Sequence, residues 1–338
     1  MDRKIIFFFA IQFFCLGHTL KGQSDIGFKQ YYQTPQALNP AYAGSNPYWS
    51  FSMGYGAVSL GQGLRADNYL VAANFVFPYD QMKNYGVNAL KGRRPDIFVR
   101  SNAKSMGQGK SYRSGMGISA HRQSSGWVSQ TQLQVAYAIH VPLSRKLRIS
   151  GGAGFVLSGF EADQDGIFVR DELDPVYRSF VENGGANTAY GIRVGLALHG
   201  ENFYGGYAFS RKVGESGFNL GNVSVLNVHR ISGGYRLPLA GNTDWLNSCM
   251  LNVYEKKTTV AVVSQIEYKE RIRAGVIVSP DEYFSLIAGV LIQQRGRVDI
   301  TVSQPMGGEG GISDNKTLLE LGLSVFCFRY QGQKRRFW

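Results

Sequence analysis

Long apolar runs and proline are scarce in this sequence. Beyond the N-terminus no apolar run approaches the roughly 18 to 20 residues of a membrane-spanning helix, and the longest, residues 284–292, is about half that length. Helical insertion into a membrane is therefore excluded. The chain has only 10 Pro but 42 Gly, 19 Tyr and 21 Phe, with 44% hydrophobic residues and a mean hydropathy of −0.16. This composition is unusual for a helical enzyme and normal for an outer-membrane β-barrel, whose strands alternate lipid-facing and lumen-facing residues.

The first residues have the layout of a secretory signal. Arg3 and Lys4 precede an apolar run over residues 5–16, and small residues follow before position 23. A signal peptide is expected over residues 1–22. Cys15 lacks the flanking residues of a lipoprotein signal and is assigned to the removed peptide.

Alternation of apolar with polar or small residues organises the rest of the chain. Leu133, Val135, Tyr137, Ile139 and Val141 fall on one face of an expected strand. The pattern predicts an all-β fold, a closed antiparallel barrel of about fourteen strands, and an even number suits a barrel with both termini in the periplasm. The expected strands cover residues 48–60, 67–77, 114–123, 128–141, 146–160, 188–199, 202–212, 230–239, 245–254, 258–268, 271–278, 283–292, 297–303 and 317–328.

The connections between these segments predict an orientation. Three long segments, residues 161–187, 213–228 and 304–316, are expected outside the cell, and the short turns fall on the periplasmic side. One long connection, residues 78–113, falls on the periplasmic side instead. The expected parts of the chain are the signal peptide, an N-terminal periplasmic or lumen segment at 23–47, the barrel at 48–329 with its insertion at 78–113, and a tail at 330–338.

Positive charge dominates the chain. The formal net charge is +12, and removing the signal, with three cations and one acid, leaves +10. Cations suit a surface that meets lipopolysaccharide phosphates or an acidic partner. A nucleic-acid partner is excluded by the export signal and by the lack of a recognition motif.

The insertion at residues 78–113 carries much of this charge. Lys91, Arg93, Arg94 and Arg100 are candidate contacts to an anionic periplasmic partner. The insertion could instead fold into the lumen as a plug, with the apolar residues 97–99 to bury. A third interpretation is a disordered, solvated turn.

Candidates for chemistry are few. Asp163, Asp165 and Asp171 lie in an acidic exterior segment where alternate aspartates precede a glycine, a weak calcium pattern, and a solvated acidic loop is the favoured interpretation. The four histidines beyond the signal are scattered over separate strands, without metal-ligand spacing. No nucleophile elbow or phosphate loop is present, so no cofactor is expected and the protein is predicted not to be an enzyme, although a site assembled from distant strands is an open alternative.

The most informative stretch is QYYQTPQALNPAYAGS, residues 30–45. Its two prolines and the closing Gly-Ser disfavour a helix and predict an extended segment that ends in a turn. Within it, the signature residues are Asn39, Pro40, Ala41, Tyr42, Ala43 and Gly44. By chemistry alone the stretch could equally be an ordered N-terminal linker.

This stretch resembles the start of the PorP/SprF family of outer-membrane proteins of the type IX secretion system. Two turn sequences, at residues 137–144 and 233–239, resemble family turns in the expected order. The insertion at 78–113 and the tail at 330–338 depart from the pattern, and both leave open whether this chain shares the partner of other members.

The resemblance implies an accessory role at the outer membrane of a Bacteroidetes-type cell. The barrel would bind or anchor a secreted adhesin or another substrate by its C-terminal sorting domain, in contact with secretion components and with outer-membrane lipid and lipopolysaccharide. The alternative is a solute-transporting, porin-like barrel, because about fourteen strands can enclose a conducting lumen. The two differ in whether the N-terminal segment and the basic insertion fill that lumen.

Overall fold

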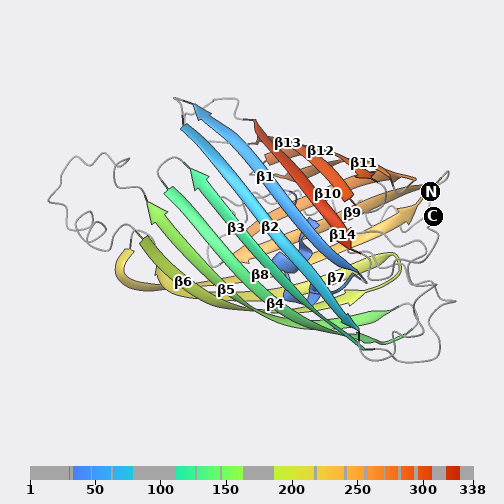
Figure 1. Cartoon of the computed structure of the whole chain (residues 1–338), viewed down its shortest axis with the longest axis horizontal. Helices are drawn as coiled ribbons and strands as arrows, with labels where there is room; N and C mark the ends of the chain where they lie inside the picture. The colour runs from blue at the N-terminus through green and yellow to red at the C-terminus, as the bar shows by residue number, and fades with distance from the viewer. Residues whose placement is uncertain are drawn as a thin grey trace.

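The computed structural model describes residues 30, 33–46, 48–61, 64–78, 112–125, 128–144, 147–162, 186–216, 219–239, 242–254, 258–269, 271–280, 283–292, 296–306 and 317–327. These residues form a closed barrel in which every strand is antiparallel to its neighbours in the sequence, and β1 pairs with β14 to close it (Figure 1). The closing register joins Trp49 to Cys327, so the chain enters and leaves the barrel at the same end. Among the described residues no helix has the length and apolarity to cross a membrane.

The fourteen strands match the number expected from the sequence. They are β1 (Trp49–Gly61), β2 (Leu64–Pro78), β3 (Arg113–Ser125), β4 (Val128–Pro142), β5 (Arg148–Ala162), β6 (Ala186–His199), β7 (Phe203–Ser216), β8 (Asn219–Pro238), β9 (Thr243–Tyr254), β10 (Thr258–Tyr268), β11 (Ile272–Ser279), β12 (Tyr283–Ile292), β13 (Gly296–Pro305) and β14 (Leu318–Cys327).

The prediction of an exterior loop at residues 213–228 is wrong. β7 continues to Ser216 and β8 begins at Asn219, so this stretch is a strand hairpin. Backbone pairing between the two strands continues through this stretch, from Val213 opposite Val225 to Glu215 opposite Val223. Cross-strand pairing overrides weak β-propensity here.

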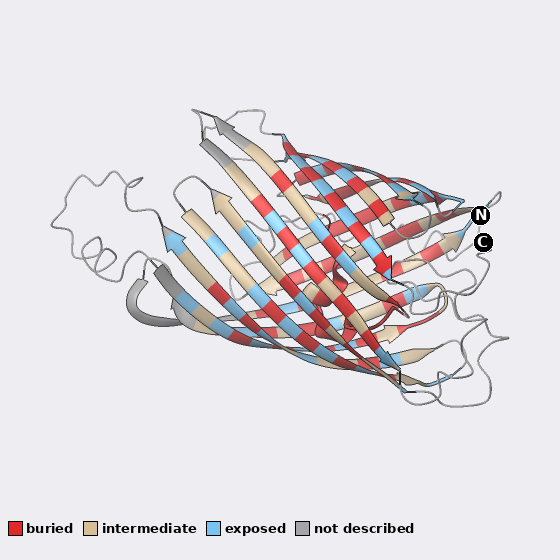
Figure 2. Ribbon diagram, in the orientation of Figure 1, coloured by how far each residue is buried: buried red, intermediate tan, exposed pale blue. Residues whose placement is uncertain are grey.

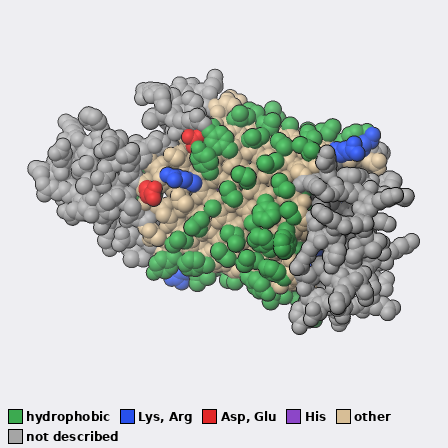
Figure 3. Space-filling model, in the orientation of Figure 1, with side chains coloured by type: hydrophobic (Ala, Val, Ile, Leu, Met, Phe, Trp, Pro, Cys, Tyr) green, Lys and Arg blue, Asp and Glu red, His purple; other side chains and the backbone are tan. Residues whose placement is uncertain are grey.

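The strands alternate as a membrane barrel requires. β14 alternates buried and exposed residues along its whole length, and the same alternation covers the wall (Figure 2). Outward-facing residues such as Ile192, Leu196 and Leu286 are large, apolar and more than half exposed. Figure 3 shows hydrophobic side chains spread over one broad face of the wall. Side chains on the inner face are buried and mostly polar or small, which fits lipid outside and a filled lumen inside.

Candidate functional site

The signature stretch lies inside the barrel. Figure 1 shows its two short 3-10 helices, η2 (Pro35–Ala37) and η3 (Pro40–Tyr42), as blue coils in the interior enclosed by the strands. The prediction of an extended segment is therefore wrong. Each proline occupies the first helical position, where its missing N–H costs nothing and its fixed φ favours the turn. The predicted closing turn is present at Gly44, whose φ is +67°.

Asn39 fixes the start of η3 and ties it to the wall. Its Oδ1 accepts a hydrogen bond from the N–H of Ala41 at 2.9 Å, which caps the helix. Its Nδ2 donates to the carbonyl of Leu196 on β6 at 3.1 Å and to that of Tyr207 on β7 at 3.3 Å. The side chain of Asn39 thus caps the first turn of η3 and forms hydrogen bonds to two neighbouring strands.

Glycines of the wall leave room for the segment. A Cβ on Gly152 of β5 would lie 2.6 Å from the backbone nitrogen of Ala41. A Cβ on Gly115 of β3 would lie 2.2 Å from the Cα of Gly44. A Cβ would also lie less than 3 Å from an atom of the segment at four other wall glycines, Gly117, Gly195, Gly206 and Gly322. We call these six residues the glycine cradle. At Gly152 and Gly115 a larger residue would overlap the backbone of the segment, whereas at the other four it would meet side chains of the segment first.

Tyr42 anchors η3 through its ring. The ring meets His199 edge-on at a centroid distance of 5.3 Å and Tyr204 at 6.0 Å, arrangements that aromatic pairs prefer. Its hydroxyl lies 3.3 Å from Ser232 Oγ on β8. Burial raises the pKa of the Tyr42 phenol to about 12.

The last residues of the signature bind the opposite part of the wall. His140 of β4 contacts the carbonyl oxygen of Ala43 through Nε2 at 2.7 Å, and its Nδ1 lies 2.6 Å from Ser150 Oγ. The N–H of Gly44 donates to Asn74 Oδ1 on β2 at 2.7 Å. Side chains from β2, β4 and β5 therefore join in holding this short stretch.

The end of η2 leaves carbonyl oxygens that need donors. Side chains from three strands supply them. The carbonyls of Gln36, Ala37 and Leu38 accept from Gln134 Nε2 at 2.9 Å, from Arg193 Nη1 and from Arg230 Nη1 at 3.0 Å, respectively. Because all three donors are buried, these bonds compensate for the desolvation of two guanidinium groups as well as of the backbone.

The first part of the segment binds the far wall. Gln33 Nε2 donates to Asp299 Oδ2 on β13 at 2.8 Å, and Ser324 Oγ of β14 donates to Gln33 Oε1 at 3.1 Å. Gln30 Nε2 donates to the carbonyl of Glu320 at 3.2 Å. Asp299 also forms a buried ion pair with Arg273 of β11 at 2.7 Å. The segment thus crosses the lumen from β13 and β14 to the strands on the other side.

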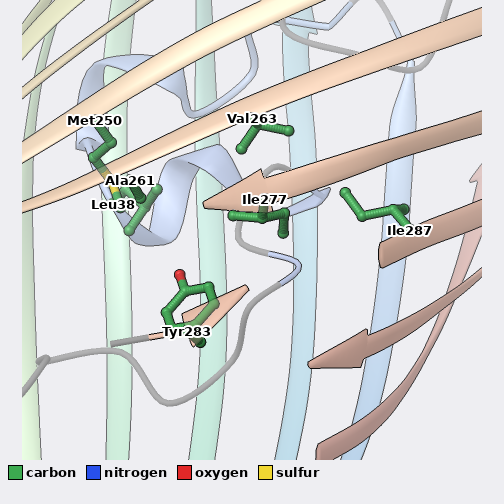
Figure 4. Packing of buried hydrophobic residues seen from close by; sticks show 7 residues of the cluster. All are labelled: Leu38, Met250, Ala261, Val263, Ile277, Tyr283 and Ile287. Atoms are coloured by element: carbon green, nitrogen blue, oxygen red, sulfur yellow. The ribbon is translucent and has the colours of Figure 1, made fainter. Parts of the chain in front are cut away.

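Leu38 adds an apolar contact to this set. It belongs to a buried cluster in which the other members come from β9 to β12 (Figure 4). The members are Leu38, Met250, Ala261, Val263, Ile277, Tyr283 and Ile287. Burying a leucine side chain stabilises by about 1.5–3 kcal/mol, so this contact favours the inserted position of the segment.

Comparison with known proteins decides the family. The family model described as type IX secretion system membrane protein PorP/SprF matches residues 20–319. The chain belongs to the PorP/SprF family. It is accordingly an outer-membrane β-barrel associated with type IX secretion. No curated protein matches the sequence.

Solved barrels resemble this PorP/SprF member only distantly. The toluene transporter TbuX of Ralstonia pickettii has 11% identity and a TM-score of 0.49, with 86% of this chain and 92% of that chain covered. The NanC porin has 12% identity and a TM-score of 0.38, with 81% and 98% covered. The translocator domain of the autotransporter NalP of Neisseria meningitidis has 8% identity and a TM-score of 0.37, with 82% and 87% covered. Similarities this distant carry no functional argument.

The structure brings together one of the three predicted groups of site residues. All six PorP/SprF signature residues lie against the wall, buried. The basic candidates Lys91, Arg93, Arg94 and Arg100 and the calcium candidates Asp163, Asp165 and Asp171 lie outside the described residues. Sequence reasoning missed the residues that receive the signature, above all the glycine cradle, Gln134, Arg193 and Arg230. The high glycine content was a signal for the cradle, but it did not point to the three polar side chains.

A potential catalytic pair inside the barrel is covered by the signature segment. Within the described ranges, no group of three or more His, Cys, Asp or Glu residues could hold a metal ion. His140 and Ser150 form a nucleophile-and-base pair in outline, but both side chains are 1% exposed and His140 Nε2 is occupied by the carbonyl of Ala43. A substrate could reach this pair only after the signature segment had left.

Proposed function

We propose that this barrel is a non-enzymatic accessory of type IX secretion that binds or anchors a secreted surface protein at the outer membrane. The partner would be an adhesin or another substrate with a C-terminal sorting domain. PorP/SprF membership supports an association with secretion. The observation that supports a binding role is that the lumen is filled. The family signature crosses the lumen and forms hydrogen bonds to strands on both sides of the barrel.

The filled lumen weighs against a solute-transporting barrel. A conducting path would have to pass buried contacts that run from Asp299 on β13 to Asn74 on β2. Removing the segment would break the hydrogen bonds from Arg193 and Arg230 to its carbonyls and would expose the apolar cluster around Leu38 to water. A barrel closed in this way would act through its surfaces, with exterior connections facing the exported domain and periplasmic ones facing the secretion machinery.

Affinity purification from native outer membrane tests this proposal. The tagged full-length protein, extracted in mild detergent, should recover a large exported protein with a C-terminal sorting domain, or periplasmic components of the secretion machinery, identified by mass spectrometry. An unrelated tagged barrel from the same membrane is the control and should recover neither. A preparation that holds the barrel alone would count against the secretion role, and conductance would then be the next measurement.

A further inference from the structure

A histidine on the outer face of the barrel is held by two aromatic neighbours. The Tyr207 hydroxyl on β7 lies 2.8 Å from Nδ1 of His229 on β8. The imidazole also lies against the Phe209 ring, at a centroid distance of 5.0 Å. Both aromatic residues come from β7, where Phe209 is directly opposite His229 in the register. His229 is itself exposed, so these contacts fix its ring while its outer edge stays accessible.

An exposed arginine lies next to this histidine. Arg211 is two residues beyond Phe209 on β7, so the two share a face and Arg211 is diagonally opposite His229. Diagonal neighbours on adjacent strands lie about 7–8 Å apart, within reach of a long side chain. A guanidinium and an imidazole can therefore reach the same group.

Arg211 and His229 face the lipid. Lys212 and Arg230, which follow them in the sequence, have buried side chains that bond inside the lumen. Successive side chains of a strand point to opposite faces, so Arg211 and His229 point outward. Ile192, opposite Arg211 on β6, is 64% exposed on the same outer face. The medium around these residues is therefore the membrane.

Strand geometry places Arg211 near one boundary of the membrane. It lies eight residues along β7 from Phe203, an exposed aromatic residue at the end where the chain enters and leaves the barrel. At about 3.3 Å per residue and a tilt of about 40°, this is about 20 Å of height, close to the roughly 25 Å of the apolar band. With both termini in the periplasm, as expected from the sequence, Arg211 and His229 lie at the outer-leaflet boundary, where lipid headgroups begin.

The acids on the outer face at this end are already bonded within the wall. Asp67 of β2 accepts a hydrogen bond from the Tyr55 hydroxyl at 2.8 Å, and Glu161 of β5 accepts from Ser129 Oγ at 3.3 Å. Arg211 has no hydrogen-bond or ion-pair partner among the described residues. Its charge is therefore available to an anion outside the chain, and basic residues at this level of a membrane protein attract anionic lipid headgroups.

We propose that Arg211 and His229 bind a phosphate of an outer-leaflet lipid, the lipid A part of lipopolysaccharide. A guanidinium can donate two parallel hydrogen bonds to two oxygens of one phosphate. When the Tyr207 hydroxyl donates to Nδ1 of His229, the ring proton is on Nε2, which donates to a third oxygen. The exposed Ile192 and Ile231, on the strands to either side of β7, would contact the acyl chains. This lipid site is independent of the proposed function, which concerns an exported protein.

The test is lipid binding by the purified full-length barrel in detergent, measured by native mass spectrometry. Arg211→Gln should bind phosphorylated lipid A about tenfold more weakly than the wild type, because charge-assisted hydrogen bonds are lost. His229→Phe keeps a ring against Phe209 but removes the Nε2 donor, and its affinity should fall about threefold. Lipid A without its phosphates should bind the wild type and both variants equally. Heat-modifiable migration shows that each variant folds.

Arg122→Gln is the matched control. Arg122 is also an exposed arginine of the outer face, but the residues opposite it, Tyr69 on β2 and Thr131 on β4, include no histidine. This substitution changes the net charge of the protein by the same amount. It should alter the affinity for phosphorylated lipid A by less than about twofold.

Three results would overturn the lipid site. Equal losses in Arg122→Gln and Arg211→Gln would show that overall charge, and not this pair of residues, attracts the lipid. Wild-type binding that does not depend on the phosphates would exclude the proposed contact. Tighter binding of phosphatidylglycerol than of lipid A would assign the residues to the inner leaflet. None of these results bears on the recovery of an exported partner, so the two proposals fail separately.

Discussion

Replacing Gly152 with valine is expected to open the lumen to ions. The new Cβ would lie 2.6 Å from three backbone atoms, Ala41 N and the carbonyl carbon and oxygen of Pro40. Overpacking costs about 1–3 kcal/mol when side chains can shift, and more is expected here because the obstacle is backbone. Displacing η3 relieves the overlap, since β5 itself is held by strands on both sides. In planar lipid bilayers the wild type should be silent and Gly152→Val should give discrete conductance steps.

The neighbouring glycine provides a matched control. A Cβ on Gly151 points to the other face of β5, where its nearest atom is Leu196 Cδ2 at 3.8 Å, an ordinary contact. Gly151→Val adds the same atoms to the same strand and should stay as silent as the wild type. Equal conductance in the two variants, or none in Gly152→Val despite normal heat-modifiable migration, would contradict the account of a lumen filled by the signature segment.

Removing the positive charge of Arg273 is expected to destabilise the whole barrel. Its guanidinium forms an ion pair with Asp299 at 2.7 Å, and the two side chains are 6% and 0% exposed. Arg273→Met would leave the buried carboxylate of Asp299 without this cation, while Gln33 still donates to it. Breaking a buried pair from one side costs about 3–5 kcal/mol. Urea unfolding of the purified barrel in detergent should show a loss of that size in the free energy of unfolding.

Two further variants separate charge from packing. Arg271→Met changes an exposed residue of the adjacent turn and should cost no more than about 1 kcal/mol. Adding Asp299→Asn to Arg273→Met removes the stranded charge and should recover much of the loss. If Arg273→Met unfolds at the wild-type urea concentration, or if the double variant is less stable than the single one, the buried ion pair does not have the role assigned to it.

Strand number and facing were predictable because both are local properties. Apolar and polar residues alternate at consecutive positions such as 133–141, and lipid outside and a filled lumen inside act on each strand separately. The β7–β8 hairpin was missed because its stability depends on pairing between residues such as Gly214 and Ser224, which local propensity does not reveal.

The position of the signature was not predictable for a different reason. Its partners are far away in the sequence: Asn39 binds Tyr207, His140 binds the carbonyl of Ala43, and Gln30 binds the carbonyl of Glu320. A wall glycine that receives the segment looks the same in the sequence as one that faces open space, such as Gly205. Only closure of the barrel distinguishes them, because it brings the cradle around the segment.

A designed disulfide tests the central claim that the signature segment sits in the lumen of the native protein. A Cβ on Gly117 lies 3.5 Å from the Cβ of Ala43, within the range for a disulfide, and the atom it meets first is Cγ of the Gln36 side chain at 2.7 Å, so that side chain has to shift. The double variant Ala43→Cys and Gly117→Cys would be made with the two free cysteines, Cys249 and Cys327, replaced by serine. Gly159→Cys, in place of Gly117→Cys, is the control, because a Cβ at Gly159 has no atom within 4 Å. Mass spectrometry of unreduced digests from intact outer membranes should find the 43–117 linked peptide and no 43–159 link; no 43–117 link under oxidising conditions, in a barrel that folds, would contradict the account.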